Sequence, residues 1–253
     1  MITVKYAFLI ILLGVSPCWS QEKPQIKDPA KIKIVLAVQN LGGRAFIDFS
    51  NSAQPLLGVF LSGEKVTDAA LAPLANLKNL RELNLYRSGV TSAGMTHLKT
   101  LVSLQTLDLG ETKVDNTGLA QLKDLKNLQS LNLSGTAVSD GGLSTVKDFT
   151  ALNSLYLSRS AVTNAGLGQL KTLKGLRALF LAGTKITDGG LVHLKPLTQL
   201  QSLDLSETAI TPAALEQLKT MKSLRNLYLR EVKIPGKAVR ELQKALPQLK
   251  VFR

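Results

Sequence analysis

The stretch LQTLDLGETKVDNTGLAQLKDL, residues 104–125, contains the pattern that decides the fold. A close copy, LRALFLAGTKITDGGLVHLKPL, occupies residues 176–197. The first leucine of the unit recurs every 24 residues, at Leu56, Leu80, Leu104, Leu128, Leu152, Leu176, Leu200 and Leu224. Eight units therefore cover residues 56–248, and such a period is typical of a solenoid in which each unit stacks on its neighbours.

The repeated unit, L-x-x-L-x-L-x-x-T-x-V/I-T-D/N-x-G-L, resembles the leucine-rich repeat family, whose signature is L-x-x-L-x-L-x-x-N/C-x-L. Its second half is similar to exported bacterial members of that family. The resemblance spans residues 56–248 and implies an α/β fold and a binding role. That fold is a right-handed horseshoe, with parallel strands on the concave face and short helices on the convex face.

The chain departs from the family at the asparagine or cysteine position. This position holds Glu64, Ser88, Thr112, Thr136, Ser160, Thr184, Thr208 and Val232. A threonine or serine hydroxyl can still bond the turning backbone. Valine cannot, so we expect the last repeat to be irregular.

Alternation along each strand separates core residues from surface residues. In LNSLYLSRS, residues 152–160, Leu155 and Leu157 are expected to point inward, and Tyr156 outward. A threonine, serine or aspartate then caps a short helix. Stacking eight strands at about 4.8 Å gives a sheet of roughly 40 Å.

Residues 1–20 are predicted to be a secretory signal peptide rather than part of the fold. Lys5 supplies a weak positive region, a short apolar run follows, and cleavage is expected after Ser20. The apolar run is too short to span a bilayer, so we expect no membrane span. Cleavage would remove Cys18, the only cysteine, and leave an exported protein, periplasmic or extracellular, without disulfides.

The two ends of the array should carry caps. Residues 21–55 are assigned to a leader and an N-terminal cap, with a helix that starts after Asp28 and ends near Gly42 or Gly43. A strand over residues 44–50 should lead into the first repeat. A last helix over residues 235–246 and a closing segment over residues 249–253 should end the fold.

Aromatic side chains concentrate at outward strand positions, although aromatics make up only 5% of the chain. The predicted anchors of a protein-binding face are Tyr86, Tyr156, Phe180 and Tyr228, and its polar rim is Arg87, Asp108, Arg159, Asp204 and Arg230. Aromatics on a rigid surface offer a large contact area with few rotors to freeze. The alternative is cross-strand packing that only shields the sheet. The mixed charges favour a protein partner over a uniformly acidic polymer.

One helix position forms a lysine ladder: Lys99, Lys123, Lys147, Lys171, Lys195 and Lys219. Cations near helix C-termini suit the helix dipole and improve solubility. The functional alternative is adhesion to an anionic envelope polysaccharide or lipid. No nucleic-acid partner is expected despite the net charge of +13, because the chain has no nucleic-acid-binding motif.

Catalysis has little support in the sequence. His97 and His193 occupy the same position four repeats apart, too far for one metal ion. Two acidic pairs remain as a remote hydrolase alternative: Asp108 with Glu111, and Asp204 with Glu207. A hydrolase of this kind needs its carboxyls in a cleft, which an open concave sheet does not offer. We therefore expect a non-catalytic scaffold without a cofactor.

Overall fold

The computed structural model describes residues 26–253. Its strands form one sheet in sequence order, from β1 to β10. The strands are β1 (Arg44–Ile47), β2 (Leu56–Phe60), β3 (Glu82–Asn84), β4 (Thr106–Asp108), β5 (Ser130–Asn132), β6 (Ser154–Tyr156), β7 (Ala178–Phe180), β8 (Ser202–Asp204), β9 (Asn226–Tyr228) and β10 (Lys250–Phe252). From β2 onward all pairs are parallel, and in each pair the partners are one 24-residue period apart.

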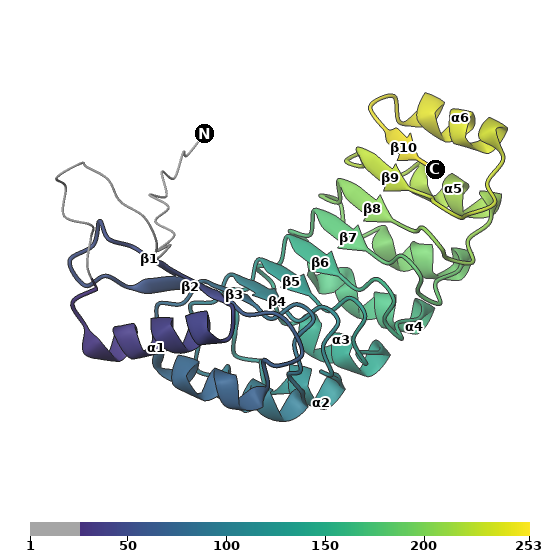
Figure 1. Cartoon of the computed structure of the whole chain (residues 1–253). Coiled ribbons are helices and arrows are strands. Elements are labelled where there is room, and N and C mark those ends of the chain that lie inside the picture. The colour runs from purple at the N-terminus through teal and green to yellow at the C-terminus, as the bar shows by residue number, and fades with distance from the viewer. Residues whose placement is uncertain (1–25) are drawn as a thin grey trace.

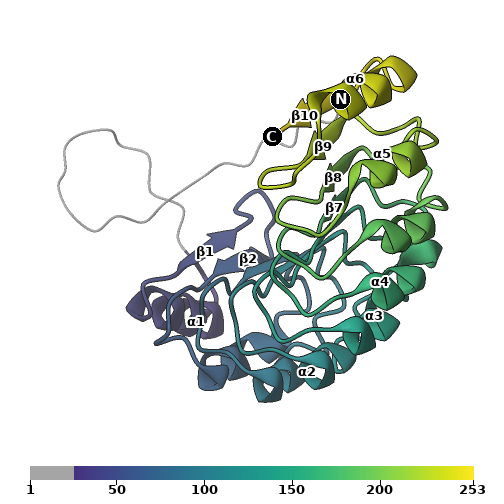
Figure 2. The ribbon, with the colours of Figure 1, turned by 90° about the vertical axis from the view of Figure 1, so that its right-hand side faces the viewer.

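Each connection between parallel strands carries a short helix, of α or 3₁₀ type. The helices are α1 (Pro29–Asn40), η1 (Asp68–Asn76), η2 (Ser92–His97), α2 (Asn116–Ala120), α3 (Asp140–Val146), α4 (Asn164–Leu167), η3 (Gly168–Thr172), η4 (Asp188–Leu194), α5 (Pro212–Leu218) and α6 (Gly236–Ala245). Figures 1 and 2 show an arc in which the sheet lines the inner side and the helices follow the outer side. The predicted leucine-rich repeat solenoid is therefore confirmed.

The leucines of the repeat fill the space between sheet and helices. Leu152, Leu155 and Leu157 are completely buried, as the alternation predicts, and Tyr156 between them is only half-buried. Each buried leucine contributes roughly 1.5–3 kcal/mol relative to an exposed one. Because the core runs the length of the arc, no repeat can close it alone.

A polar ladder joins successive repeats at the start of their helices. The side chain of Asp68 accepts hydrogen bonds from the backbone N–H of Thr91, at 2.8 Å, and from its hydroxyl, at 2.7 Å. Asn116 and Asp140 make the equivalent backbone contact with Ser139 and Thr163. The T-D/N pair of the motif therefore connects neighbouring turns and does not only cap one helix.

At the repeat position where the family has asparagine or cysteine, threonine hydroxyls do bond the turning backbone. Thr112 donates to the carbonyl of Leu109 at 2.6 Å, and the other threonines repeat this bond. The serine hydroxyls of Ser88 and Ser160 are buried and have no partner among the described residues. The irregular last repeat expected from Val232 is not seen in its strand, because β9 keeps its parallel register with β10.

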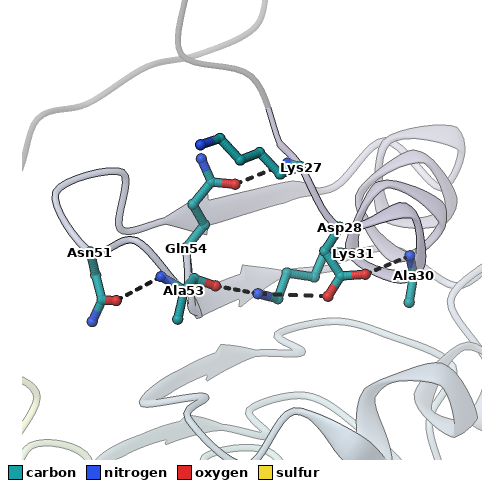
Figure 3. A network of polar contacts seen from close by, with 7 residues as sticks. All are labelled: Lys27, Asp28, Ala30, Lys31, Asn51, Ala53 and Gln54. Carbon is teal, nitrogen blue, oxygen red and sulfur yellow. Dashed lines mark hydrogen bonds and ion pairs between the residues drawn. The ribbon is translucent and has the colours of Figure 1, made fainter.

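The N-terminal cap consists of α1 and an antiparallel β1–β2 hairpin. Asp28 caps α1 by accepting from the N–H of Ala30 at 2.9 Å, and Gly42 beyond the helix is left-handed, with φ 76°. Figure 3 shows how Lys31 joins the hairpin turn to the helix by donating to the carbonyl of Ala53. The strand is shorter than residues 44–50, because Asp48 accepts from the N–H of Ser50 and turns the chain.

The predicted signal peptide, residues 1–20, lies outside the described residues, as does the first part of the leader. In the part that the structure does describe, no helix has the length and apolar character needed to cross a membrane.

Candidate binding face

Four aromatic rings form a continuous row on the concave side of the sheet. We call Tyr156, Phe180, Tyr228 and Phe252 the aromatic row. The rings of Tyr156 and Phe180 stack at 4.7 Å between centroids with 6° between their planes, and those of Tyr228 and Phe252 stack at 4.7 Å and 14°. Phe180 reaches Tyr228 at 6.3 Å across the intervening strand β8. The row therefore crosses the sheet from β6 to β10.

Phe252 belongs to this row although the sequence reasoning assigned it to the cap. It pairs in register with Tyr228, one repeat period earlier, so the signal was present in the 24-residue spacing. At 44% exposure Phe252 is the most open ring of the row, whereas the other three are half-buried. The exposed end of the row thus lies at the last strand.

Asp204 sits between two of these rings. Its strand position pairs with Phe180 on one side and Tyr228 on the other. The carboxylate accepts the backbone N–H of Ser206 at 2.9 Å. A single acidic group therefore interrupts an otherwise aromatic row.

Tyr86 and Asp108, two further predicted site residues, lie elsewhere on the concave side. Tyr86 follows β3 and carries the guanidinium of Arg87 5.7 Å from its ring centroid. Asp108 on β4 lies in register between Asn84 and Asn132. The structure therefore divides the predicted face into the aromatic row and a polar half over β2–β5.

The loops after the strands carry charged residues in a strained conformation. Arg87, Glu111 and Arg159 have φ of 55°, 54° and 54°, where glycine is favoured. At the same repeat position Gly135 and Gly183 have φ of 64° and 66°. Arg87 pairs with Glu111 at 3.2 Å, and Arg159 reaches the same carboxylate at 3.9 Å across Gly135. The edge of the concave side therefore carries a row of fixed charges.

Arg230, the last rim residue, is exposed, and its backbone N–H donates to the hydroxyl of Ser206 at 3.1 Å. Glu231 beside it occupies the left-handed position, with φ 58°. This rim residue therefore lies at the same end of the sheet as Phe252.

The lysine ladder lies on the helical side of the arc. Lys147, Lys195 and Lys219 follow directly on the last residues of α3, η4 and α5. Lys219 pairs with Glu216 at 2.6 Å, and the remaining ladder lysines make no ion pair within the described chain. The ladder and the aromatic row therefore occupy opposite faces.

Asp108 of the first acidic pair lines a hollow on the concave side, so the expectation that the sheet offers no cleft is wrong for this residue. Glu111 is engaged by Arg87 and Arg159, while Asp108 accepts hydrogen bonds from neutral groups. Residues 26–253 contain no group of three or more histidine, cysteine, aspartate or glutamate side chains that could hold a metal ion.

Comparisons with known proteins agree with this architecture. The family model described as a leucine-rich repeat region matches residues 60–253. Internalin C2 of Listeria monocytogenes is similar in structure, with a TM-score of 0.64, 20% identity, and coverage of 93% of this chain and 100% of that one.

An internalin F structure from the same organism has a TM-score of 0.56 and 21% identity. That comparison covers 76% of this chain but only 57% of the internalin, so this chain spans little more than half of its length. At these identities the likeness concerns the fold alone. No curated protein matches the chain. The repeats, the sheet and the family model together establish that this chain belongs to the leucine-rich repeat family.

Proposed function

We propose that this protein is an exported, non-catalytic scaffold whose concave sheet binds a protein partner. The aromatic row carries the proposal: four rings in mutual contact lie on the open side of a rigid sheet. Rings already fixed by stacking lose little side-chain entropy on binding. Aromatic residues are also enriched among those that contribute most to the affinity of interfaces.

The charges around the row favour a protein over a uniform polymer. Arg159 and Arg230 are positive, while Asp204 and Glu207 are negative, so both signs flank the rings. A partner with complementary charges would gain orientation and association rate from this arrangement. Export rests on residues 1–20, whose sequence pattern is typical of a secretory signal peptide.

The first test is capture of a partner by the tagged full-length protein from envelope and secreted fractions of the producing organism. Tyr156→Ala/Phe180→Ala should abolish the capture, because it removes the stacked pair that begins the row. Val102→Ala/Val192→Ala is the matched control, since both valines are 46% exposed and neither lies on a strand. Capture that survives the aromatic change would contradict the proposal, as would equal loss in the control.

The lysine ladder supports a second candidate, adhesion to an anionic envelope polysaccharide or lipid. The observation in its favour is that one repeat position is lysine in six successive repeats, five of them without an ion pair in the described chain. Changing Lys147, Lys171 and Lys195 to glutamate should then remove binding to anionic vesicles. That binding should also weaken with salt, because exposed charges are screened over about 10 Å at 0.1 M. Capture lost in this variant alone would place the interaction on the helical side.

A further inference from the structure

The polar half of the concave side contains a pocket of ≈ 530 Å³. It lies where the N-terminal cap meets the first repeats, and strands β1–β5 contribute to its lining. Its side chains include those of Arg44, Phe60, Asn84, Tyr86, Asp108 and Asn132. Two aromatic rings and several planar polar groups thus line one hollow, separate from the aromatic row.

Asp108 is the acidic group of this pocket, and all its hydrogen-bond donors are neutral. One carboxylate oxygen, Oδ1, accepts from the N–H of Gly110 and from the amide of Asn132, both at 2.9 Å. The other, Oδ2, accepts only from the amide of Asn84 at 3.4 Å, near the outer limit for a hydrogen bond. Oδ2 therefore retains room for a stronger donor.

The charge of Asp108 is partly removed from water without a counter-ion. Burial raises the pKa of its carboxyl, although the hydrogen bonds from Gly110 and Asn132 lower it. In the described chain Asp108 forms no salt bridge within 4.0 Å, and the nearby Arg87 and Arg159 pair with Glu111 instead. Arg44, the first residue of β1, lies three strand spacings of about 4.8 Å each from β4, which carries Asp108.

Gly110 leaves room for three of the side chains that line the pocket, those of Asn132, Tyr86 and Asp108. A Cβ at this position would lie 2.7 Å from Nδ2 of Asn132, 3.0 Å from the ring of Tyr86 and 3.1 Å from Oδ1 of Asp108. Any side chain here would displace the groups that hold Asp108. Five of the eight repeats carry serine or alanine at this position, but the repeat that contains Asp108 carries glycine.

We propose that this pocket receives a basic side chain, lysine or arginine, of the protein partner, which pairs with Asp108. This inference rests on the proposed function and names the chemistry that the partner presents. A half-buried carboxylate without a counter-ion gains more from an incoming cation than an exposed, already paired one. The rings of Phe60 and Tyr86 offer apolar surface to the alkyl stem and a face to the cation. A neutral saccharide would leave the charge of Asp108 uncompensated.

The test uses the isotope-labelled full-length protein and the probe Nα-acetyl-arginine methylamide, followed by NMR. At millimolar concentrations the probe should shift the side-chain amide signals of Asn84 and Asn132, which contact Asp108. The citrulline analogue has the same shape without the charge. It should bind at least about ten-fold more weakly, which corresponds to about 1.4 kcal/mol.

Two variants locate the effect. Asp108→Asn removes the charge, and Gly110→Ala keeps the charge but displaces the side chains of Asn132, Tyr86 and Asp108, so both should abolish the arginine response at Asn132. Asp148→Asn is the control, because Asp148 is exposed and follows α3 on the helical side. Raising the salt concentration should weaken the response of the unchanged protein.

Three results would overturn the inference: equal shifts with citrulline, shifts with N-acetylglucosamine in place of arginine, or no shift with the arginine probe. None of these depends on finding the natural partner. The partner capture could require Tyr156 and Phe180 while the arginine probe causes no shift. That combination would support the proposed function and disprove only this inference. A positive titration without any capture would support a basic ligand for this pocket and count against the aromatic row as the capturing surface.

Discussion

The ring of Phe252, on the last strand, stacks on the ring of Tyr228 with 4.7 Å between centroids. This contact places the C-terminal end of the described chain in the aromatic row. Its consequence is that the row ends in an exposed ring that a partner can cover.

Phe252→Ala should weaken partner capture and lower the free energy of unfolding by about 0.5–1.5 kcal/mol, the range for an aromatic pair. Phe252→Tyr keeps the ring and should preserve both properties. Capture assays and urea unfolding measure the two effects separately. Full capture by the alanine variant would mean that contact with the partner ends at Tyr228.

The second prediction concerns Gly135, which occupies the left-handed loop position. Gly135→Val should lower the free energy of unfolding by at least about 1–2 kcal/mol, because a β-branched residue is strained at φ 64°. The matched change is Gly175→Val, where no left-handed φ is required and the new Cβ would meet only a carbonyl oxygen at 3.8 Å. Urea unfolding of the two variants gives the comparison, and equal losses would exclude backbone strain as the cause.

Arg159 occupies the same left-handed loop position, where backbone strain opposes an ion pair. Arg159→Gly removes the strain but also an exposed ion pair at 3.9 Å and some rigidity of the unfolded chain. These effects oppose one another, so stability should change by less than about 1 kcal/mol. A larger loss would show that the pair with Glu111 matters for folding as well as for binding.

Neighbouring core and surface positions directly after β6 should differ in their tolerance of a charge. Leu157→Asp should prevent folding, because Leu157 is completely buried and an unpaired carboxylate there would have no compensating partner. Ser158→Asp, at the next and half-buried position, should fold. Circular dichroism distinguishes them, and a well-folded Leu157→Asp protein would disprove the inward assignment.

The 24-residue spacing was enough to predict most of the fold, because each repeat must bury the same set of leucines against its neighbours. The buried leucines, the parallel register and the helix starts all follow from Leu104 and its equivalents. The same arithmetic could have placed Phe252 beside Tyr228, had it been continued one period further.

Features that depend on side-chain reach could not be predicted in this way. Phe180 on β7 contacts Tyr228 on β9 across the intervening strand β8, so comparing directly successive repeats does not reveal this contact. The left-handed backbone at Arg87 has no local signal, since arginine is not typical of that conformation. The polar pocket depends on where the N-terminal cap packs, and the cap lies outside the repeat.

Asp115 makes a pH-dependent contribution to the ladder between repeats. The hydroxyl of Ser92 donates to it at 2.6 Å and, with donors from Thr117 and Gly118, holds the pKa of its carboxyl well below the usual range. A depressed folded pKa stabilises the protein fully above the unfolded value of about 3.9, and this contribution is lost as the pH falls below it.

Asp115→Asn should therefore lower the melting temperature at pH 7, with a difference that shrinks below about pH 4. Ser139→Ala is the neutral comparison one repeat later, where the hydroxyl accepts from Asn116 at 2.8 Å. Its effect should not depend on pH. Thermal unfolding at several pH values tests both, and a pH-independent loss in the Asp115 variant would exclude the carboxylate charge as the cause.

The contribution of Asp108 to the pH dependence of stability should have the opposite sign to that of Asp115. Burial raises the pKa of its carboxyl, so the folded protein holds the proton more tightly than the unfolded chain does. The ionised group then costs stability at pH 7, and this cost disappears below the unfolded value of about 3.9.

Asp108→Asn should consequently raise or leave unchanged the melting temperature at pH 7, and the difference should vanish near pH 3. The amide oxygen can still accept from the N–H of Gly110 and from Asn132, so these two hydrogen bonds survive and only the long bond from Asn84 is lost. Thermal unfolding at the two pH values, with Asp148→Asn as control, provides the measurement. A marked loss of stability at pH 7 would mean that the carboxylate supports the fold. A gain, combined with loss of the arginine response, would mean that the chain keeps a destabilising charge for the sake of its partner.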